Sequence, residues 1–295
     1  MNGREKGFLL LSSHLGDPAR KPLTTAQLRT LAQRMQHLEH PRVDRDLMPS
    51  DLAKLGYGPN LANRVVQLLE EESVLDYYVQ KGTKFGCVPV TRVSEGYPLL
   101  LRRRLGLDSP GCLWAKGDLS LLAEPGVALV GSRDIREDNR KFAEEVGRQA
   151  ALQGYVLISG NARGADRSAQ NACLAAGGKV ICVVADELAK QPVRERVLYL
   201  SEDGYNEAFS AQRALSRNRC VHSLGILTFV AQSALGMGGT WDGTTKNLHN
   251  GWSAVRCFDD GSDAVKRLAQ MGAGLVGMED LASFYDLIEN NLFDR

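Results

Sequence analysis

The chain of 295 residues is long enough for one large domain or two ordinary ones, and its 43% hydrophobic and 24% charged residues are typical of a soluble globular protein. A formal net charge of +1 excludes recognition of nucleic acid by overall basicity, so such a role would need a local basic patch. The six cysteines form no CxxC pair, and no stretch approaches the roughly 20 apolar residues that span a bilayer, so we expect reduced thiols, a cytoplasmic location and no membrane contact.

Short helices are predicted over residues 1 to about 80. The predicted helix starts are Thr24 or Thr25, Pro49, Pro59 and Ser73. Tight turns that contain glycine and proline join these helices, which is typical of a small bundle. Such bundles include helix-hairpin-helix and SAM-like modules that bind DNA backbones or proteins, and others that only pack. The pattern does not separate these uses, and we expect a helical domain at 1–83 and a second domain at 84–295.

A transition segment at about 84–125 leads into the second domain. Strands are predicted at 84–90 and 112–115. Between them, an apolar cluster at 97–101 runs into the arginine run 102–104. Three adjacent cations at this point are read either as a solvated helix end or as a phosphate contact.

The stretch from Gly126 to Asp166 is predicted to be a β-α-β unit. Apolar runs at 127–130 and 155–158 each end in small residues, and residues 137–153 between them carry apolar side chains at helical spacing. Parallel strands joined in this way predict an α/β fold, with helices on the faces of a parallel sheet. In such sheets, ligands bind beyond the carboxyl ends of the strands.

The remaining residues continue the alternation of strands and helices. The predicted elements are a helix at 166–176, a strand at 180–185, an ambiguous segment at 187–200 that ends in a strand at 197–200, a helix at 205–215, a strand at 224–230, a glycine-rich loop at 236–244, a short helix to about 250, a strand at 254–258, a helix capped by Ser262, a turn at 272–277 and a closing helix at 278–292. This alternation favours one sheet for the whole second domain.

Four loops of small residues follow strand-like runs, at 131–134, 159–166, 201–204 and 236–244. A single loop of this kind is weak support for a site, because glycine at a turn usually serves backbone geometry. At one edge of one sheet, however, the four loops would form a concave surface rich in N–H donors. The arginines in or beside these loops are Arg133, Arg163, Arg217 and Arg219. Each arginine alone is equally well explained as a surface or ion-paired residue, but together they predict an anion-binding site.

Several polar residues near these loops have two interpretations. Asp166 can cap the following helix or orient an arginine. Asn218 can hold a loop or read the edge of a base or ribose. Thr240 and Thr244 can be helix caps or phosphate ligands.

Aromatic and histidine residues give no sign of catalysis. Trp241 and Trp252 can stack on a base or lie in the core. His222 and His249 have no obvious partner and are interpreted as structural. Because no catalytic triad and no metal-ligand cluster is visible, binding is a better interpretation than catalysis.

The loop sequences resemble those of the DNA-processing protein A family (DprA/Smf). The matching motifs are Val130-Gly-Ser-Arg133, Ile158-Ser-Gly-Asn-Ala-Arg-Gly-Ala-Asp166, Ala176-Gly-Gly-Lys-Val180, Ser201-Glu202 and Arg217-Asn-Arg219, preceded by Tyr97-Pro98-Leu and Leu113-Trp-Ala-Lys-Gly-Asp118. This resemblance covers most of the chain and implies an extended Rossmann-like parallel sheet with helices on both faces, preceded by a SAM-like helical domain. It also implies a basic pocket for single-stranded DNA, a homodimer, and delivery of the DNA to the RecA recombinase during uptake of foreign DNA. No cofactor and no metal are expected.

Carried over residue by residue, the resemblance implies a binding pocket. Its residues would be Gly131, Ser132, Arg133, Ser159, Gly160, Arg163, Gly164, Asp166, Arg217, Asn218 and Arg219. The segment 238–240 is also similar to the glycine-rich phosphate loop of the LOG/SLOG group, which adds Gly239 and Thr240 as phosphate-binding residues. A nucleotide sensor or nucleotide N-glycosidase is therefore an alternative, although Asp242 and Gly243 stand where the catalytic glutamate of that group would follow. A scaffold with an unused pocket is a third alternative.

The sequence departs from the DprA/Smf pattern on the ligand side. Residues 214–216 read Ala-Leu-Ser where the family has Phe-Pro before its Arg-Asn-Arg run, and 236–243 replace its later Ser-Gly-Ser loop. The family's C-terminal winged-helix module is not found in the sequence. We therefore interpret the chain as a divergent member, with a mobile-element or anti-phage role as an alternative to DNA uptake.

Overall fold

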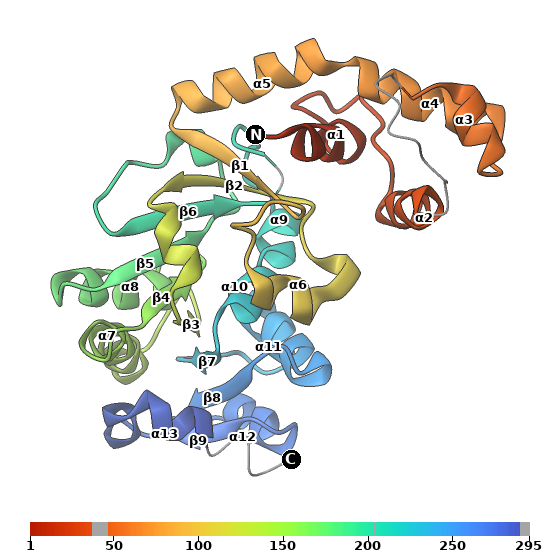
Figure 1. Ribbon diagram of the computed structural model, residues 1–295. Helices are drawn as coiled ribbons and strands as arrows, with labels where there is room; N and C mark the ends of the chain where they lie inside the picture. Colours follow the sequence, from red (N-terminus) through yellow and green to blue (C-terminus); the bar gives the residue numbers. More distant parts are fainter. Residues whose placement is uncertain (37–46, 203, 290–295) are drawn as a thin grey trace.

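The computed structural model describes residues 1–36, 47–202 and 204–289, and the strands within them form one nine-stranded sheet (Figure 1). The order across the sheet is β1-β2-β6-β5-β4-β3-β7-β8-β9. The strands are β1 (Cys87–Thr91), β2 (Cys112–Gly117), β3 (Gly126–Val130), β4 (Val156–Ser159), β5 (Lys179–Val183), β6 (Val197–Ser201), β7 (Leu227–Val230), β8 (Ala254–Phe258) and β9 (Gly274–Val276). Strands β3 to β9 run parallel to one another, whereas β1 and β2 are antiparallel. The predicted α/β class with an extended Rossmann-like sheet is confirmed.

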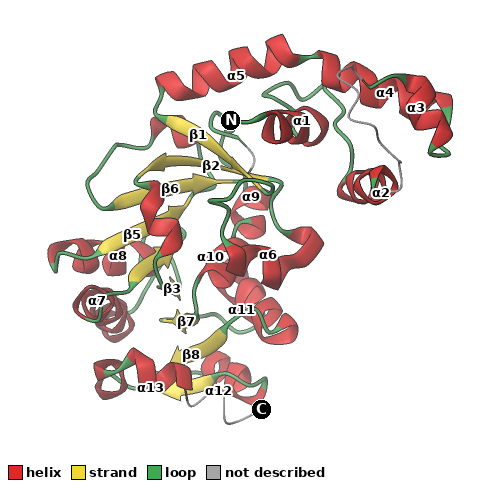
Figure 2. Ribbon diagram, viewed as in Figure 1, coloured by secondary structure: helices red, strands yellow, loops and turns green. Residues whose placement is uncertain are grey.

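Helices cover both faces of this sheet (Figure 2). One face carries α7 (Glu137–Leu152), α8 (Ala165–Ala175) and α13 (Phe284–Glu289), and the other carries α6 (Leu99–Leu105), α10 (Asn218–Leu224), α11 (Gly238–Asn250) and α12 (Asp263–Gln270). Alternate strand residues point to opposite layers, so Cys182 joins the core on the α8 side and Ile181 joins the other core. In the described ranges, no helix is long and apolar enough to cross a membrane.

A set of helices precedes the sheet. They are α1 (Gly3–Ser12), α2 (Thr25–Met35), α3 (Pro49–Lys54), α4 (Pro59–Glu70) and α5 (Glu72–Lys84). Helix α2 begins as predicted, because the Thr24 hydroxyl accepts from the Gln27 amide at 3.2 Å and the Gln27 side chain accepts from the Thr24 amide at 3.0 Å. Helix α1 was not predicted as a separate element, and the predicted continuation of α2 to Leu38 lies outside the described residues.

Two hydrophobic cores meet in this N-terminal region. Helices α2, α3 and α4 share a small core of their own. Helix α5 instead packs on the sheet, where the Tyr78 ring lies 5.3 Å from Trp114 and 4.7 Å from Tyr205, measured between centroids. Gly82 allows this approach, because a Cβ there would lie 2.9 Å from the Trp114 ring. The end of α5 therefore belongs to the core of the sheet.

The helix predicted at 205–215 is wrong in its first half, because only Ala211–Ser216 is helical (α9). Tyr205 is fully buried between Tyr78 and Trp114, and its hydroxyl donates to the Tyr78 carbonyl at 3.0 Å. Residues 206–210, which follow this anchor, are not helical. Ser210 then caps α9 by accepting from the amide of Arg213 at 3.1 Å.

The glycine-rich segment 236–244 is mostly helix rather than loop, because α11 begins at Gly238. The strand predicted at 224–230 begins only at Leu227, and Leu224 is the last residue of α10. Helices α10 and α11 pack together, and a Cβ at Gly243 would lie 3.0 Å from Nε2 of His222. Close packing here outweighs the low helix propensity of glycine.

Two C-terminal predictions are also wrong. The turn at 272–277 contains β9, which pairs with β8. The closing helix is broken into a 3₁₀ turn, Glu279–Ala282, and α13, because Ser283 has an extended backbone. Phe284 follows it into the core, where its ring lies 4.9 Å from that of Phe229. Residues 290–292 of the predicted helix lie outside the described residues.

Candidate functional site

A pocket lies at the carboxyl edge of the sheet, where β3 has β4 on one side and β7 on the other. The strand order reverses at this point, and open α/β sheets bind ligands at such reversals. The cavity has a volume of about 500 Å³. Its lining comes from residues 130–133 after β3, 160–166 after β4, 209–221, and 232–240 after β7. Three of the four predicted loops meet here, whereas Glu202 of the fourth lines a separate hollow.

The N-terminus of α11 forms one wall of the pocket. Gly239 and Thr240 lie in its first turn, where amides have no acceptor within the helix. The N-cap residue, Met237, provides no side-chain cap. Ser233, also in the lining, has a buried hydroxyl that finds no hydrogen-bond partner among the described residues. Unpaired donors at the positive end of a helix dipole favour an anionic ligand.

Arg217 is the buried cation of the pocket, with 6% of its surface exposed. Its Nη1 donates to the carbonyl of Val183 at 2.7 Å, and its Nε is buried without a partner in the described part of the chain. Burial lowers the pKa of Arg217, although the charge of Asp166 opposes this. Gly160 leaves room for Arg217, because a Cβ at this position would overlap its guanidinium.

Asp166 fixes the loop between β4 and α8. Its Oδ2 accepts hydrogen bonds from the amides of Gly160 and Ala162, both at 3.1 Å. Burial raises the pKa of Asp166, even though Arg217 and the two amides favour the charged form. Asp166 does not cap α8, because the N-cap residue of that helix is Gly164 and no side chain caps it. Its carboxylate instead holds the loop and opposes the positive charge of Arg217.

Arg133 is the exposed cation of the lining. Its guanidinium lies 6.0 Å from the centroid of the Phe209 ring. Phe209 also lines the pocket and is 56% exposed. An exposed aromatic ring beside a cation is suited to stacking with a base whose phosphate the cation contacts.

Two of the four predicted arginines lie outside the cavity lining. The Arg163 side chain is 72% exposed and forms an ion pair with Asp134 at 2.7 Å. Arg163 belongs to the loop after β4, in which Gly160 and Ala162 line the pocket but Arg163 does not. Arg219 pairs with Glu202 at 2.5 Å and lines another hollow. The structure therefore brings Arg133 and Arg217 together but does not bring Arg219 to them.

The remaining predicted site residues support the loops. Ser159 is buried, and its hydroxyl accepts from Gln170 at 2.5 Å. Gly164 has a φ of +81° and approaches the backbone of Ser132 and Arg133 too closely for a Cβ. Gly131 and Ser132 line the cavity directly.

Helices α10 and α11 are joined by Asn218, which also lines the pocket. Its Nδ2 donates to the carbonyl of Gly239 at 3.0 Å. Trp241 and Trp252 are half-buried and pack against the core on this face, and Thr244 is buried within α11. This geometry favours a core role for both tryptophans.

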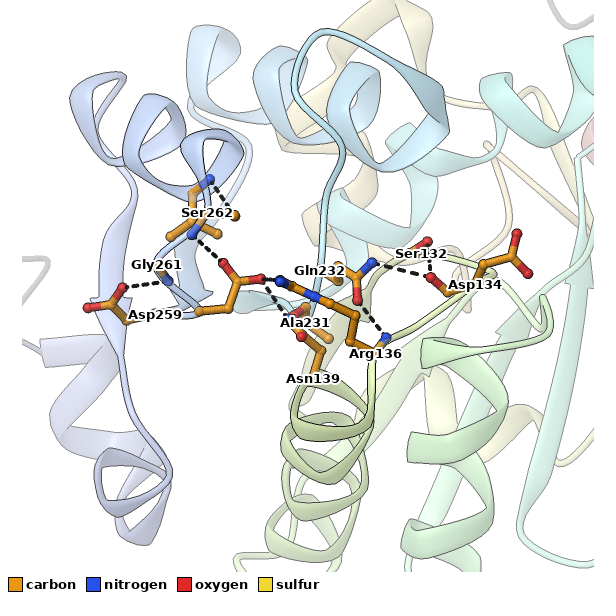
Figure 3. A network of polar contacts seen from close by, with 11 residues as sticks. Ser132, Asp134, Arg136, Asn139, Ala231, Gln232, Asp259, Gly261 and Ser262 are labelled. Carbon is orange, nitrogen blue, oxygen red and sulfur yellow. Dashed lines mark hydrogen bonds and ion pairs between the residues drawn. The ribbon is translucent and has the colours of Figure 1, made fainter.

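A network of polar contacts holds the loops after β3, β7 and β8 in place (Figure 3). The Arg136 amide donates to Gln232 Oε1 at 2.8 Å, and Gln232 Nε2 donates to the Asp134 carbonyl at 3.2 Å. Asn139 Nδ2 donates to both the Ala231 carbonyl and Asp260 Oδ2 at 2.7 Å. Arg136 forms an ion pair with Asp260, so its charge is balanced within the network.

Sequence reasoning missed Phe209 and Ser233, which both line the pocket. Ser233 follows β7 directly, so the rule that ligands bind at strand ends is a signal that could have found it. Phe209 carries no such signal. Its position depends on the burial of Tyr205, a contact with residues far away in the sequence.

His222 provides a prediction for the packing behind the pocket. It is fully buried, its Nδ1 lies 3.1 Å from Asn247 Nδ2, and burial lowers its pKa to about 3. The unfolded chain binds a proton near the ordinary histidine value of about 6.5, which the native state does not, so stability falls as the pH drops below that value. Protonation of His222 in the unfolded chain should therefore lower the free energy of unfolding by about 2 kcal/mol when the pH falls from 7.5 to 5.

Urea unfolding at the two pH values measures this effect. His222→Gln should reduce the pH dependence by that amount, whereas His249→Gln, at an exposed position on α11, should leave it unchanged. Equal pH dependence in His222→Gln and the unmodified protein would contradict the prediction.

Comparisons with known sequences point to one family. The sequence profile of DNA recombination-mediator protein A matches residues 89–286. DNA processing protein DprA of Streptococcus pneumoniae is 30% identical over 260 residues, which cover 82% of this chain and 89% of that protein. Its X-ray structure has a TM-score of 0.66 and 26% identity, covering 88% of this chain and 97% of that chain. The Helicobacter pylori protein, whose structure concerns its single-stranded DNA binding mode, has a TM-score of 0.55 and 22% identity, covering 70% of this chain and 96% of that chain.

Proposed function

This chain belongs to the DNA recombination-mediator protein A family, and on that premise we propose that it binds single-stranded DNA in the pocket at the ends of β3, β4 and β7. The observation that carries the proposal is the set of hydrogen-bond donors in the lining. The first turn of α11 faces the pocket without a side-chain cap, and the guanidinium groups of Arg133 and Arg217 belong to the same lining. Such donors suit phosphate oxygens, which carry no sequence information, so binding is expected to tolerate any base sequence.

The proposed binding mode combines one phosphate contact with one stacked base. A phosphate would lie between Arg217 and the first turn of α11, where the positive charges outnumber the carboxylate of Asp166. A base would stack on Phe209, and Arg133 would contact the adjoining phosphate. The H. pylori relative binds single-stranded DNA, which supports the same ligand class for this chain.

Family membership supports the further steps of this proposal. We infer that the protein acts in DNA recombination as a cytoplasmic homodimer and passes the bound strand to a RecA-type recombinase. Delivery of a single strand to a recombinase fits a role in DNA uptake. It also fits a role on mobile elements or in defence.

A nucleotide sensor is the second candidate, because a volume of about 500 Å³ and a partly apolar wall also suit one nucleotide. Hydrolysis of an N-glycosidic bond has less support. In the lining that the structure describes, Asp166 is the only carboxylate, and it already accepts two backbone amides. Asp242 lies outside that lining and pairs with Lys246 at 2.9 Å.

Fluorescence anisotropy with a labelled oligothymidine of about 20 nucleotides tests the proposal. Arg133→Ala should lower the affinity several-fold and reduce the slope of log affinity against log salt by about 1, because one phosphate contact is lost. Arg103→Ala is the matched control, since Arg103 is exposed on α6 and lies outside the pocket. Equal losses in both variants would contradict the assignment to this pocket, and saturable mononucleotide binding with little salt dependence would favour the sensor.

A further inference from the structure

A second polar hollow, with a volume of about 150 Å³, lies on the α8 side of the sheet. It is bounded by α8, by β5 and β6, and by residues 191–194 of the connection between these strands. Parallel neighbours are usually joined through a helix that covers the sheet. Here the connection at 184–196 contains only a 3₁₀ turn, Leu188–Lys190, in place of a connecting α-helix (Figure 1).

Donors without partners line this hollow. Arg167 and Arg194 are exposed, and neither pairs with a carboxylate in the part of the chain that the structure describes. Tyr199 is 4% exposed, yet its hydroxyl makes no hydrogen bond to any described residue. Burial raises the pKa of Tyr199, so the hydroxyl keeps its proton at neutral pH and can donate it in a hydrogen bond.

The size and chemistry of the hollow point to one kind of ligand. Its volume is below the roughly 300 Å³ of ordinary small-molecule pockets, so it is too small for a whole nucleotide. Two guanidinium groups and a phenol hydroxyl suit an oxyanion such as a phosphate group. Asn161 adds an amide to the lining, and its Nδ2 donates to Gln191 Oε1 at 3.4 Å.

One loop separates the hollow from the main pocket. Gly160 and Ala162 line the main pocket, whereas Asn161, the residue between them, lines the hollow. Arg163 follows in the same loop with 72% of its side chain exposed. A single strand that leaves the main pocket over this loop would therefore meet Arg163 first and then Arg167 and Arg194.

We propose that Arg167, Arg194 and Tyr199 form a second phosphate subsite, which holds the DNA backbone after the strand has crossed the loop between β4 and α8. This inference rests on the proposed function, because it needs a strand in the main pocket. The subsite lengthens the bound segment and does not change its tolerance of base sequence.

The test uses the full chain and two labelled oligothymidines, one of about 20 nucleotides and one of about 4, at several salt concentrations. Arg167→Gln combined with Arg194→Gln should lower the affinity for the long oligonucleotide about tenfold and reduce its salt slope by about 2, and should leave the short one unchanged. Arg103→Gln combined with Lys266→Gln removes the same charge at exposed positions outside both cavities and should change neither. Tyr199→Phe should weaken only the long oligonucleotide, by a few-fold.

The outcomes separate this inference from the proposed function. If the unmodified protein binds neither oligonucleotide, the proposed function fails and this inference fails with it. If Arg133→Ala weakens both and the Arg167, Arg194 double variant weakens neither, only the second subsite is overturned. Inorganic phosphate is tested separately by thermal unfolding. If phosphate stabilises the unmodified protein but not the Arg167, Arg194 double variant, and both proteins bind DNA equally well, the ligand of the subsite is free phosphate and not DNA.

Discussion

Gly160→Ala is expected to lower the affinity for single-stranded DNA at least tenfold while the protein stays folded. The new Cβ would overlap the guanidinium of Arg217, which is 6% exposed, so this guanidinium has to shift. That guanidinium must therefore leave the carbonyl of Val183, and the buried positive charge of the pocket moves with it. A tenfold loss corresponds to about 1.4 kcal/mol, close to the contribution of one charged hydrogen bond. Anisotropy measures the affinity, and circular dichroism checks the fold.

A second glycine provides the control for this substitution. A Cβ added at Gly96 would have no heavy atom within 4 Å, and the backbone there is not left-handed, so Gly96→Ala should bind DNA like the unmodified protein. Unchanged affinity in Gly160→Ala would contradict this expectation.

The central part of the fold could be predicted from the sequence because local signals and topology agree there. Apolar runs that end in small residues identify β3 and β4, and parallel strands must present their carboxyl ends at one edge. That rule alone brings Gly131 and Gly160 to one pocket. Consistency between the local pattern and the global fold is what made this region predictable.

The contrasting positions of Arg217 and Arg219 could not be predicted, because residues 216–219 have no clear helical pattern. Asn218–Leu224 is a helix, and its N-cap residue, Arg217, has right-handed helical backbone angles as well (φ −64°, ψ −19°). Successive side chains are then about 100° apart, so residues two positions apart point in nearly opposite directions. Arg217 therefore faces the pocket, and Arg219 faces Glu202. Arg217 and Arg219 are close in the sequence, which suggested a joint role. With helical backbone geometry, however, this separation of two positions turns their side chains to different sides.

Long-range contacts decide the parts that the sequence did not reveal. Glycines at 236–244 indicate a loop by propensity, yet packing of α11 against α10 makes the segment helical and brings its N-terminus to the pocket. Phe209 depends in the same way on Tyr205, which is anchored by α5. No local pattern contains these contacts.

Asp166→Ala is expected to lower the free energy of unfolding by about 2–3 kcal/mol, since it removes a buried acceptor and the negative charge that favours the buried cation of Arg217. It also removes the acceptor of two loop amides, those of Gly160 and Ala162. Urea denaturation at pH 7 measures the loss. Asp166→Asn should lose less, because its side-chain oxygen can still accept these two hydrogen bonds.

The double variant Asp166→Ala with Arg217→Met tests the cost of burying this charged pair. Burial raises the pKa of Asp166 despite the nearby arginine, so the charged carboxylate is destabilised overall by its surroundings. Replacing both charges by apolar groups should therefore recover at least about 1 kcal/mol relative to Asp166→Ala alone, whereas the loss of the Arg217 charge should weaken DNA binding. A double variant as unstable as the sum of its single variants would contradict this expectation. In that case the two charges together would raise the free energy of unfolding. The positive charge at the phosphate site would then not destabilise the fold.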